Sequence, residues 1–280
     1  MNLIHKTVRK SNALVEASYR LSVYEQRIIL ACISQIGRND ELTDQVSYRV
    51  SAAEIAKAAG VTPQAAYQRI REATERLWKR EVTITQSPNG GGLLKAPTVV
   101  RWIQSRSEYS EGDAFVELQF SQKIIPYLTE LSREYTKYKF GDVSQMSSGY
   151  AVRLYEMLVQ WDGVGKREVE VAWLKDSLQV GDKYPAMKDF KKWVLQPSVD
   201  QVNKHSPLNV EWTQRKTGRS VTHIIFSFSL KEPKTTPKKI PEDKKSHDRM
   251  LFGYRESVLT ANARPGETFE MVAKRLRQEK

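Results

Sequence analysis

The feature that most constrains the fold of this chain is a sequence plan that occurs twice. Each copy begins with a serine suited to cap a helix, followed by a tyrosine and an arginine at matching offsets, and the two sets are Ser22, Tyr24 and Arg27, and Ser148, Tyr150 and Arg153. An apolar-periodic helix follows in both copies, expected to end near Ile36 and near Trp161. The repeat predicts two related structural units in one chain.

The same succession of elements follows each opening helix: a strand, two helices joined by a turn, and two further strands. The expected ranges are strand 47–50, helices 52–59 and 63–79 and strands 82–85 and 98–103 in the first copy, and strand 168–171, helices 173–178 and 185–195 and strands 208–212 and 221–228 in the second. This order is typical of a winged helix. The sequence therefore predicts an α+β fold with two pseudo-symmetric winged-helix domains in tandem.

The expected division of the chain is an N-terminal domain over 1–112, a C-terminal domain over 113–230, and a linker with a flexible basic tail over 231–280. Between the copies, residues 114–120 alternate as a strand, and Ser121 is expected to cap a short helix through Leu131 that Pro126 bends. The start of the tail is rich in lysine and proline and cannot bury a core. A short terminal helix is expected because one helical face is shared by Phe269, Val272, Ala273 and Leu276.

The charge of the chain favours a polyanionic partner. Forty-five Lys and Arg against 33 Asp and Glu give a net charge of +12 and a pI of about 9.6. The segment 231–280 holds 13 basic and 8 acidic residues, which leaves 32 basic against 25 acidic residues in the rest of the chain. Since the excess is not confined to the tail, double-stranded DNA is the expected partner. The alternative is a soluble protein that has a high pI but binds no polyanion.

The composition indicates a soluble protein, expected in the cytoplasm and without a membrane partner. The mean hydropathy is −0.56, and no stretch approaches the roughly 20 apolar residues that span a bilayer. The N-terminus lacks the apolar core of a secretory signal. The single cysteine, Cys32, excludes an intramolecular disulfide and is expected in the core beside Ile28 and Ile29, the alternative being a reactive nucleophile.

In the first helix-turn-helix, Gly60 permits the turn between the two helices. The second helix is expected to bury a stripe formed by Ala66, Ile70, Ala73 and Leu77. Its other face presents Gln64, Gln68 and Arg71, whose amide and guanidinium groups suit base edges of DNA. An ordinary solvated helix face is the alternative.

In the second helix-turn-helix, the apolar stripe is expected at Met187, Phe190 and Val194. Three lysines, Lys188, Lys191 and Lys192, cluster on another face and repel one another unless an anion neutralises them. The wing of this copy adds Arg215, Lys216 and Arg219 at a hairpin turn over 215–219. These six residues are the main candidates for DNA contact, with a solvated charge run as the alternative.

Catalytic machinery is not expected, and neither is a cofactor or a metal. The stretch Gly90–Lys95 lacks the end of a phosphate-binding loop and is interpreted as a flexible wing tip. The four histidines, His5, His205, His223 and His247, are scattered and lack metal-ligand spacing. Three classes of DNA-binding protein are open alternatives: a transcriptional repressor with no replication role, a nicking enzyme of rolling-circle replication, for which the histidine cluster is missing, and an architectural protein, for which apolar wing tips are missing.

Over about residues 5–230 the chain resembles the iteron-binding plasmid replication initiators, the RepE-like and RepA-like proteins. The resemblance rests on the segments 22–30, 120–128, 148–158 and 184–195, followed by Pro197, Val202 and Asn203. It implies that the second winged helix reads most of the site in the major groove, with Asp189–Lys192 at the base-reading position, and that the first contacts the other end. Many members carry arginine at that position, whereas the lysines here are point charges.

The resemblance also implies how such a protein acts. Monomers bind direct repeats (iterons) at an origin and start theta-type replication, and dimers bind an inverted repeat at the operator to repress their own gene, which bears on plasmid copy control. The implied partners are the host helicase, initiator and chaperone.

Overall fold

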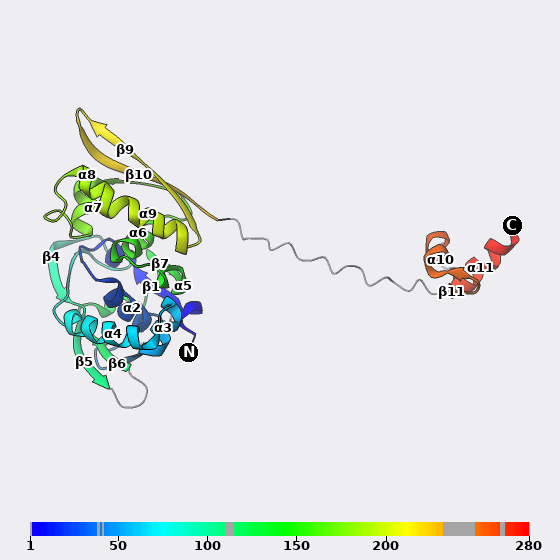
Figure 1. Ribbon diagram of the computed structural model, residues 1–280, viewed down its shortest axis with the longest axis horizontal. Helices are drawn as coiled ribbons and strands as arrows, with labels where there is room; N and C mark the ends of the chain where they lie inside the picture. The colour runs from blue at the N-terminus through cyan, green and yellow to red at the C-terminus, as the bar shows by residue number, and fades with distance from the viewer. Residues whose placement is uncertain are drawn as a thin grey trace. The chain divides into compact units, whose positions relative to one another are not determined.

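The computed structural model describes residues 2–37, 40, 42–109, 115–231, 250–263 and 267–279. The chain forms two compact units, one over Met1–Lys231 and one over Glu232–Lys280. Figure 1 shows the larger unit with many of its helices and strands labelled. Within it, both copies of the sequence repeat fold as winged helices that share one hydrophobic core.

The first winged helix begins as the sequence predicts. Its elements are α2 (Val23–Ile33), β2 (Ser47–Ser51), α3 (Ala52–Ala59) and α4 (Pro63–Leu77). Ser22 caps α2 in a capping box with Glu25, and Thr62 caps α4 with Pro63 in its first turn. Between α3 and α4, Gly60 takes a left-handed φ of 68°, the conformation for which the turn needs glycine.

The sheet of the first winged helix differs from the prediction. The hairpin that pairs with β2 is formed by β5 (Ile103–Tyr109) and β6 (Phe115–Phe120), in the strand order β2–β6–β5. The strands predicted as the wing form a separate two-stranded sheet of β3 (Glu81–Gln86) and β4 (Leu93–Arg101). The strand expected over 98–103 breaks at Trp102, because this fully buried side chain turns the chain from one sheet into the other.

This topology bears on the expected domain boundary. The boundary between 112 and 113 falls on residues 110–114, which lie outside the described residues. The β6 strand on its C-terminal side pairs with β2 and β5 on its N-terminal side. A division there separates the two strands of one hairpin, so the first winged helix extends at least to Phe120.

The tip of the β3–β4 hairpin, interpreted from sequence as a flexible wing tip, is held by hydrogen bonds. The Asn89 side chain donates to the carbonyl of Glu130 and accepts from the amide of Ser132, at 3.1 Å each. Arg133 donates to the Asn89 carbonyl at 2.9 Å. The glycines that follow Asn89 therefore belong to a turn that is fixed against the segment 130–133.

The second winged helix keeps the predicted order. Its elements are α6 (Gly149–Val159), β8 (Lys166–Glu170), α7 (Val171–Ser177), α8 (Met187–Phe190), a π-helical segment (Lys191–Leu195), α9 (Gln196–His205), β9 (Leu208–Thr217) and β10 (Ser220–Leu230). Its sheet order, β8–β10–β9, matches β2–β6–β5 of the first copy. The β9–β10 hairpin is therefore the counterpart of β5–β6, and β3–β4 is an addition to the first copy.

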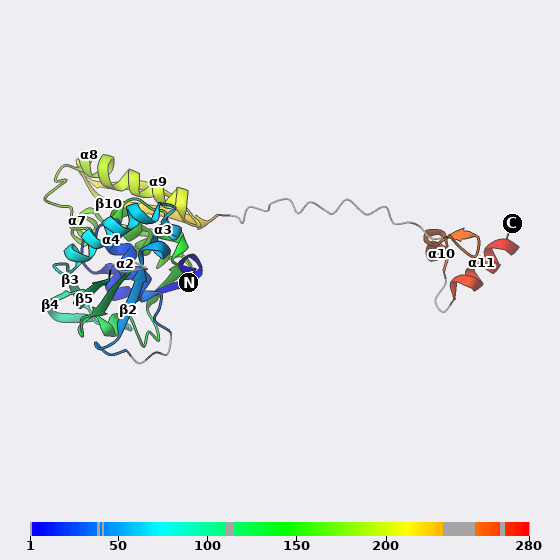
Figure 2. The same cartoon turned by 60° about the horizontal axis from the view of Figure 1, so that its bottom comes forward.

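Two boundaries in the second winged helix differ from the sequence expectation. The helix expected to end near Leu195 continues to His205, and Figure 2 shows α8 and α9 as one rod. Pro197 does not end the helix, because it lies just after a π-helical turn. In such a turn the backbone hydrogen bonds span five residues instead of four, so the α-helical pattern that a proline interrupts is already shifted there. In the wing, β9 reaches Thr217 and pairs with Ser220, so the turn is only Gly218 and Arg219.

The remaining elements of the larger unit connect the two copies. They are a 3₁₀ turn (Leu3–His5), β1 (Thr7–Ser11) paired with β7 (Tyr135–Lys139), α1 (Asn12–Glu16), a second 3₁₀ turn (Ile125–Tyr127) and α5 (Gly141–Ser144). The helix expected over 121–131 is reduced to the second of these turns, because Pro126 lies within it. Cys32 is fully buried in α2, as predicted for a core residue, and burial raises the pKa of its thiol.

The repeated arginines tie the two winged helices together in a reciprocal way. Arg27 of the first copy donates to the carbonyls of Ser144 and Met146 at 3.0 Å each, in the segment before α6. Arg153 of the second copy donates to the carbonyls of Val15 and Ala17 at 2.8 Å each, in the segment before α2. The repeat thus places a buried guanidinium from each copy on the backbone that leads into the other.

A buried polar network surrounds Arg153. Glu156 is fully buried, and its carboxylate lies 2.5 Å from Lys10 Nζ and 3.5 Å from Arg153 Nη1. The hydroxyl of Tyr138 donates to the same carboxylate. Burial alone raises the pKa of Glu156, but Lys10 and Arg153 lower it, and the net pKa lies below the ordinary value.

Glu156 is expected to make the stability of the larger unit depend on acid pH. Because its pKa is lowered in the folded state, its contribution is present above the unfolded pKa of about 4.3 and is lost as the pH falls through the lower folded value. Urea unfolding between pH 7 and pH 3 should show a smaller acid loss of stability for Glu156→Gln than for the native chain. Glu170→Gln, at an exposed carboxylate, is the control and should keep the native pH dependence. Equal acid loss in Glu156→Gln and the native chain would contradict the assignment.

The second unit has a core of its own. It contains β11 (Met250–Leu251) paired with β12 (Tyr254–Arg255), α10 (Glu256–Asn262) and α11 (Phe269–Gln278). Leu259, Val272 and Ala273 are buried, with Phe269 and Leu276 packed against them. The predicted terminal helix is confirmed, and the tail is more than a linker. The stretch 232–249, which holds the predicted proline-rich linker, lies outside the described residues.

Candidate nucleic-acid interface

The second helix of the first helix-turn-helix presents the predicted face. The apolar stripe is confirmed, because at most 2% of the surface of each of its residues is exposed: Ala66, Ile70, Ala73 and Leu77. On the other side of α4, Gln64, Gln68 and Arg71 are exposed. The Gln68 amide donates one hydrogen bond to Glu72 at 2.8 Å, which orients the Gln68 side chain along the helix surface.

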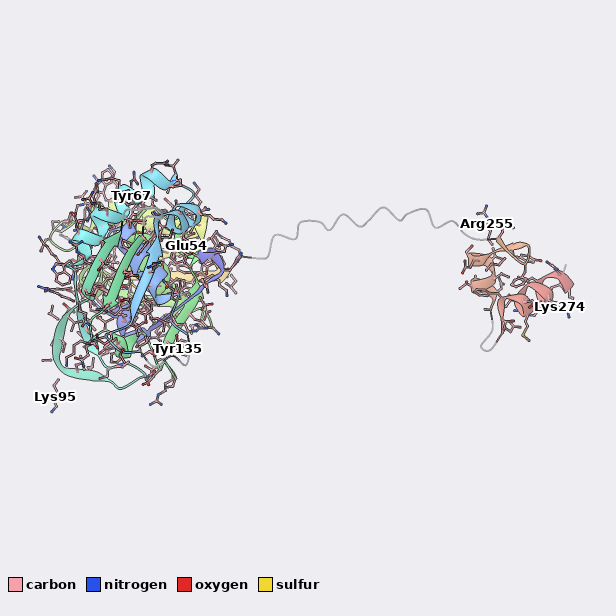
Figure 3. The ribbon with its side chains drawn as sticks, turned by 90° about the horizontal axis from the view of Figure 1, so that it is seen from below. Glu54, Tyr67, Lys95, Tyr135, Arg255 and Lys274 are labelled. Carbon is pink, nitrogen blue, oxygen red and sulfur yellow. The ribbon has the colours of Figure 1, made fainter. Side chains whose placement is uncertain are left out.

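The extra β3–β4 hairpin does not lie beside this helix. Figure 3 shows Tyr67 of α4 and Lys95 of β4 on opposite sides of the unit. A duplex placed against α4 therefore has the β5–β6 hairpin as its neighbouring wing, since that hairpin is the counterpart of β9–β10.

The second helix of each helix-turn-helix is here called its recognition helix: α4 in the first copy, and the continuous helix over residues 187–205 in the second. The start of the second recognition helix is positioned by α7. Lys175 Nζ donates to the carbonyls of Tyr184 and Pro185 at 2.8 Å each, in the loop that leads into α8. Burial lowers the pKa of Lys175. Phe190 and Val194 are buried and Met187 packs against the core, as predicted, so the helix is fixed on one side and open on the other.

The three predicted lysines of this helix differ in their surroundings. Lys188 and Lys192 are exposed, and Lys192 Nζ lies 4.7 Å from the centroid of the Trp193 ring. Lys191 is half-buried, and its Nζ lies 3.4 Å from Gln214 Oε1 on β9. Lys191 therefore faces the hairpin, whereas Lys188 and Lys192 face solvent.

The wing residues also differ from one another. Arg215 forms an ion pair with Glu168 of β8 at 2.6 Å, which sequence reasoning missed because Glu168 lies far away in the chain. The hydrogen bond from Arg215 lowers the pKa of Glu168. Lys216 and Arg219 are exposed near the turn, where Gly218 has a left-handed φ of 61°. Figure 1 shows this hairpin projecting at the end of the unit where α8 lies.

Sequence reasoning missed two further residues on this surface. Trp193 is 56% exposed on the helix beside Lys192. Gln196, one turn after Lys192, accepts a hydrogen bond from Trp212 Nε1 of β9 at 2.9 Å. The apolar periodicity of 187–195 gave a signal for Trp193, because it is the one large apolar residue between Phe190 and Val194 that falls off the buried stripe.

Other kinds of site receive no support from the described ranges. Within them, no group of three or more His, Cys, Asp or Glu side chains has the arrangement of a metal site. The same ranges contain no helix with the length and apolarity required for a membrane span.

The fold and this surface define a protein of two tandem winged helices, each with an exposed recognition helix. Residues 7–159 match the family model described as Initiator Replication protein, WH1, and residues 170–228 match that described as Initiator Rep protein, WH2. The chain belongs to this family of replication initiator proteins.

Known relatives agree with this assignment. A replication initiation protein of Escherichia coli is 28% identical over 230 residues, which cover 80% of this chain and 69% of the relative. The PI protein of Escherichia coli is 22% identical over 269 residues, which cover 83% and 86%. The crystal structure of Pi initiator protein in complex with iteron DNA has a TM-score of 0.67 at 20% identity, over 82% of this chain and 99% of that one, and so has the same fold.

Proposed function

We propose that this chain starts replication of a plasmid by binding repeated double-stranded sites, or iterons, at the origin through its two winged helices. The observation that carries this proposal is the set of exposed cations on the recognition helix and wing of the second winged helix: Lys188, Lys192, Lys216 and Arg219. Cations on a helix and on its neighbouring hairpin match a duplex whose groove takes the helix and whose backbone meets the wing. The family and the iteron complex of the related Pi initiator support the same proposal.

The two winged helices take different parts of the site in this proposal. The second supplies most of the contacts, with Lys188 in the groove, Lys192 on a phosphate at the edge of the groove, and Lys216 and Arg219 on the backbone next to the wing. Lys191 and Arg215 act mainly by orienting the hairpin, because Gln214 and Glu168 already engage them. The first winged helix contacts the other end of the site through Gln64, Gln68 and Arg71 of α4.

The chain acts in the cytoplasm by binding alone, without a catalytic step. A dimer represses the chain's own gene at an inverted repeat, and host replication proteins act on the origin once monomers occupy the iterons. Two winged helices, both belonging to the replication initiator family, support this role over that of a repressor with no replication function.

Binding of the purified full chain to DNA tests the proposal. Fluorescence anisotropy compares tandem repeats from the DNA flanking its own gene with a scrambled duplex across a salt series. We expect a preference for the repeats of about 10³-fold or more, and an affinity that falls steeply with salt. Equal affinity for the scrambled duplex would contradict sequence-specific binding.

A further inference from the structure

Trp193 is the most exposed of the six tryptophans, with 56% of its surface accessible. Tryptophan is usually well buried in folded proteins, because its large apolar surface is stabilised by leaving water. An indole left in water on a rigid helix is therefore a feature that the fold itself does not explain.

The position of Trp193 places it on the surface proposed to meet DNA. It follows Asp189 by one helical turn and lies next to Lys192, whose ammonium is 4.7 Å from the ring centroid. Phe190 and Val194 of the same helix are buried in the core, whereas Lys192 and Trp193 are exposed. Trp193 therefore lies at the border of the buried stripe, with more than half of its surface accessible and Lys192 against its ring.

The β9 strand contacts this helix through residues other than Trp193. Lys191 reaches Gln214 on β9, and Gln196 accepts from Trp212 on β9. These two contacts join the helix to the hairpin and leave 56% of the Trp193 surface accessible. When the helix enters a major groove, the indole is thus free to meet base edges, with Lys192 next to it to hold a phosphate.

From this placement we propose that Trp193 reads thymine, by packing its indole against the C5-methyl group in the major groove. The methyl group is the one apolar feature that distinguishes a base pair in that groove, so an uncharged aromatic ring matches it, whereas a phosphate matches the neighbouring lysine. The inference rests on the proposed function, because it assigns one specificity contact to the same site. It predicts at least one A·T pair under Trp193 in every strongly bound site.

The test removes only the methyl groups. Duplexes of about 20 base pairs, long enough for two successive major grooves, are first selected from a random-sequence pool by the native full chain. The best duplex is then made with thymine and with uracil in its place, position by position. Anisotropy titrations compare native chain, Trp193→Ala and Trp193→Phe, and the melting temperature of each variant checks that it is folded.

We expect uracil at one or two positions to weaken the native chain by about fourfold per methyl group, from the loss of one methyl-sized apolar contact. Trp193→Ala should bind thymine and uracil duplexes equally, and Trp193→Phe should keep part of the difference. The inference is overturned if uracil has no effect on the native chain, or if Trp193→Ala loses as much affinity as the native chain at the same positions. If selection yields no preferred duplex, the proposed function itself fails, which separates the two outcomes.

Discussion

Replacing Arg153 with alanine is expected to lower the free energy of unfolding of the larger unit by about 3–5 kcal/mol, the range for breaking a buried ionic network. The Arg153 guanidinium donates to Val15, Ala17 and Tyr19 at 2.7–2.8 Å and is 1% exposed. Its loss leaves two buried carbonyls without this donor and removes one of the two cations beside Glu156. Urea unfolding followed by tryptophan fluorescence measures the change.

Two further variants define what the Arg153 result means. Arg153→Lys keeps the charge but loses the guanidinium fork, so its loss of stability should lie between those of the native chain and the alanine variant. Arg219→Ala removes an exposed arginine from the wing and should change the stability by no more than about 0.5 kcal/mol. A loss below about 1 kcal/mol in Arg153→Ala would show that the reciprocal arginines do not hold the two winged helices together.

The second large effect is expected for DNA binding. Replacing Lys188, Lys192, Lys216 and Arg219 together with alanine should weaken binding to tandem repeats by about 100-fold or more at about 0.15 M salt. Each phosphate contact that is lost should also reduce the slope of log affinity against log salt by about 0.9. Anisotropy titrations between about 0.05 and 0.3 M salt measure both quantities.

The control for this variant removes charge elsewhere. Lys123 and Lys137 are exposed outside both recognition helices and the wing, so Lys123→Ala/Lys137→Ala lowers net charge without touching the proposed surface. Each of its two replacements should affect binding far less than each of the four. If the control lowers the salt slope as much per lysine, the cations of the second winged helix act only through net charge, and the interface lies elsewhere.

The local plan of the fold could be predicted because it depends on local signals. Ser22 and Ser148 cap their helices as expected, and Gly60 and Thr62 mark the turn and the start of α4. The buried stripe of α4 followed from apolar periodicity alone. These features depend on neighbours within a few residues, which the sequence shows directly.

Strand pairing and ion pairs were harder to predict because their partners lie far apart in the chain. The β3–β4 strands have the pattern of a wing, but pairing of β6 with β2 decides which hairpin completes the winged helix. The helix expected over 185–195 continues to His205, because a π-helical turn leaves no clear sequence signal. The matching offsets in the two copies marked Arg27 and Arg153, but their reciprocal contacts could be seen only in the tertiary structure.

In the candidate site, too, local features could be predicted from the sequence and contacts between distant residues could not. Apolar periodicity indicated which face of each recognition helix is open to solvent. The structure then showed which cations of the second winged helix are exposed and which are engaged by other side chains. Lys188 and Lys192 are exposed, whereas Lys191 and Arg215 are engaged by Gln214 and Glu168. Those partners come from other strands, so no pattern within the helix or the turn could reveal them.

Maintenance of a plasmid tests the central claim most directly. A plasmid whose only origin is the DNA flanking this gene is introduced into cells that supply the chain from a second replicon. The account predicts that the native chain and Lys123→Ala/Lys137→Ala maintain the plasmid, and that the variant lacking Lys188, Lys192, Lys216 and Arg219 does not, although it accumulates to the same level. Maintenance by that variant at the native copy number, or failure of the native chain to maintain the plasmid, would contradict the account.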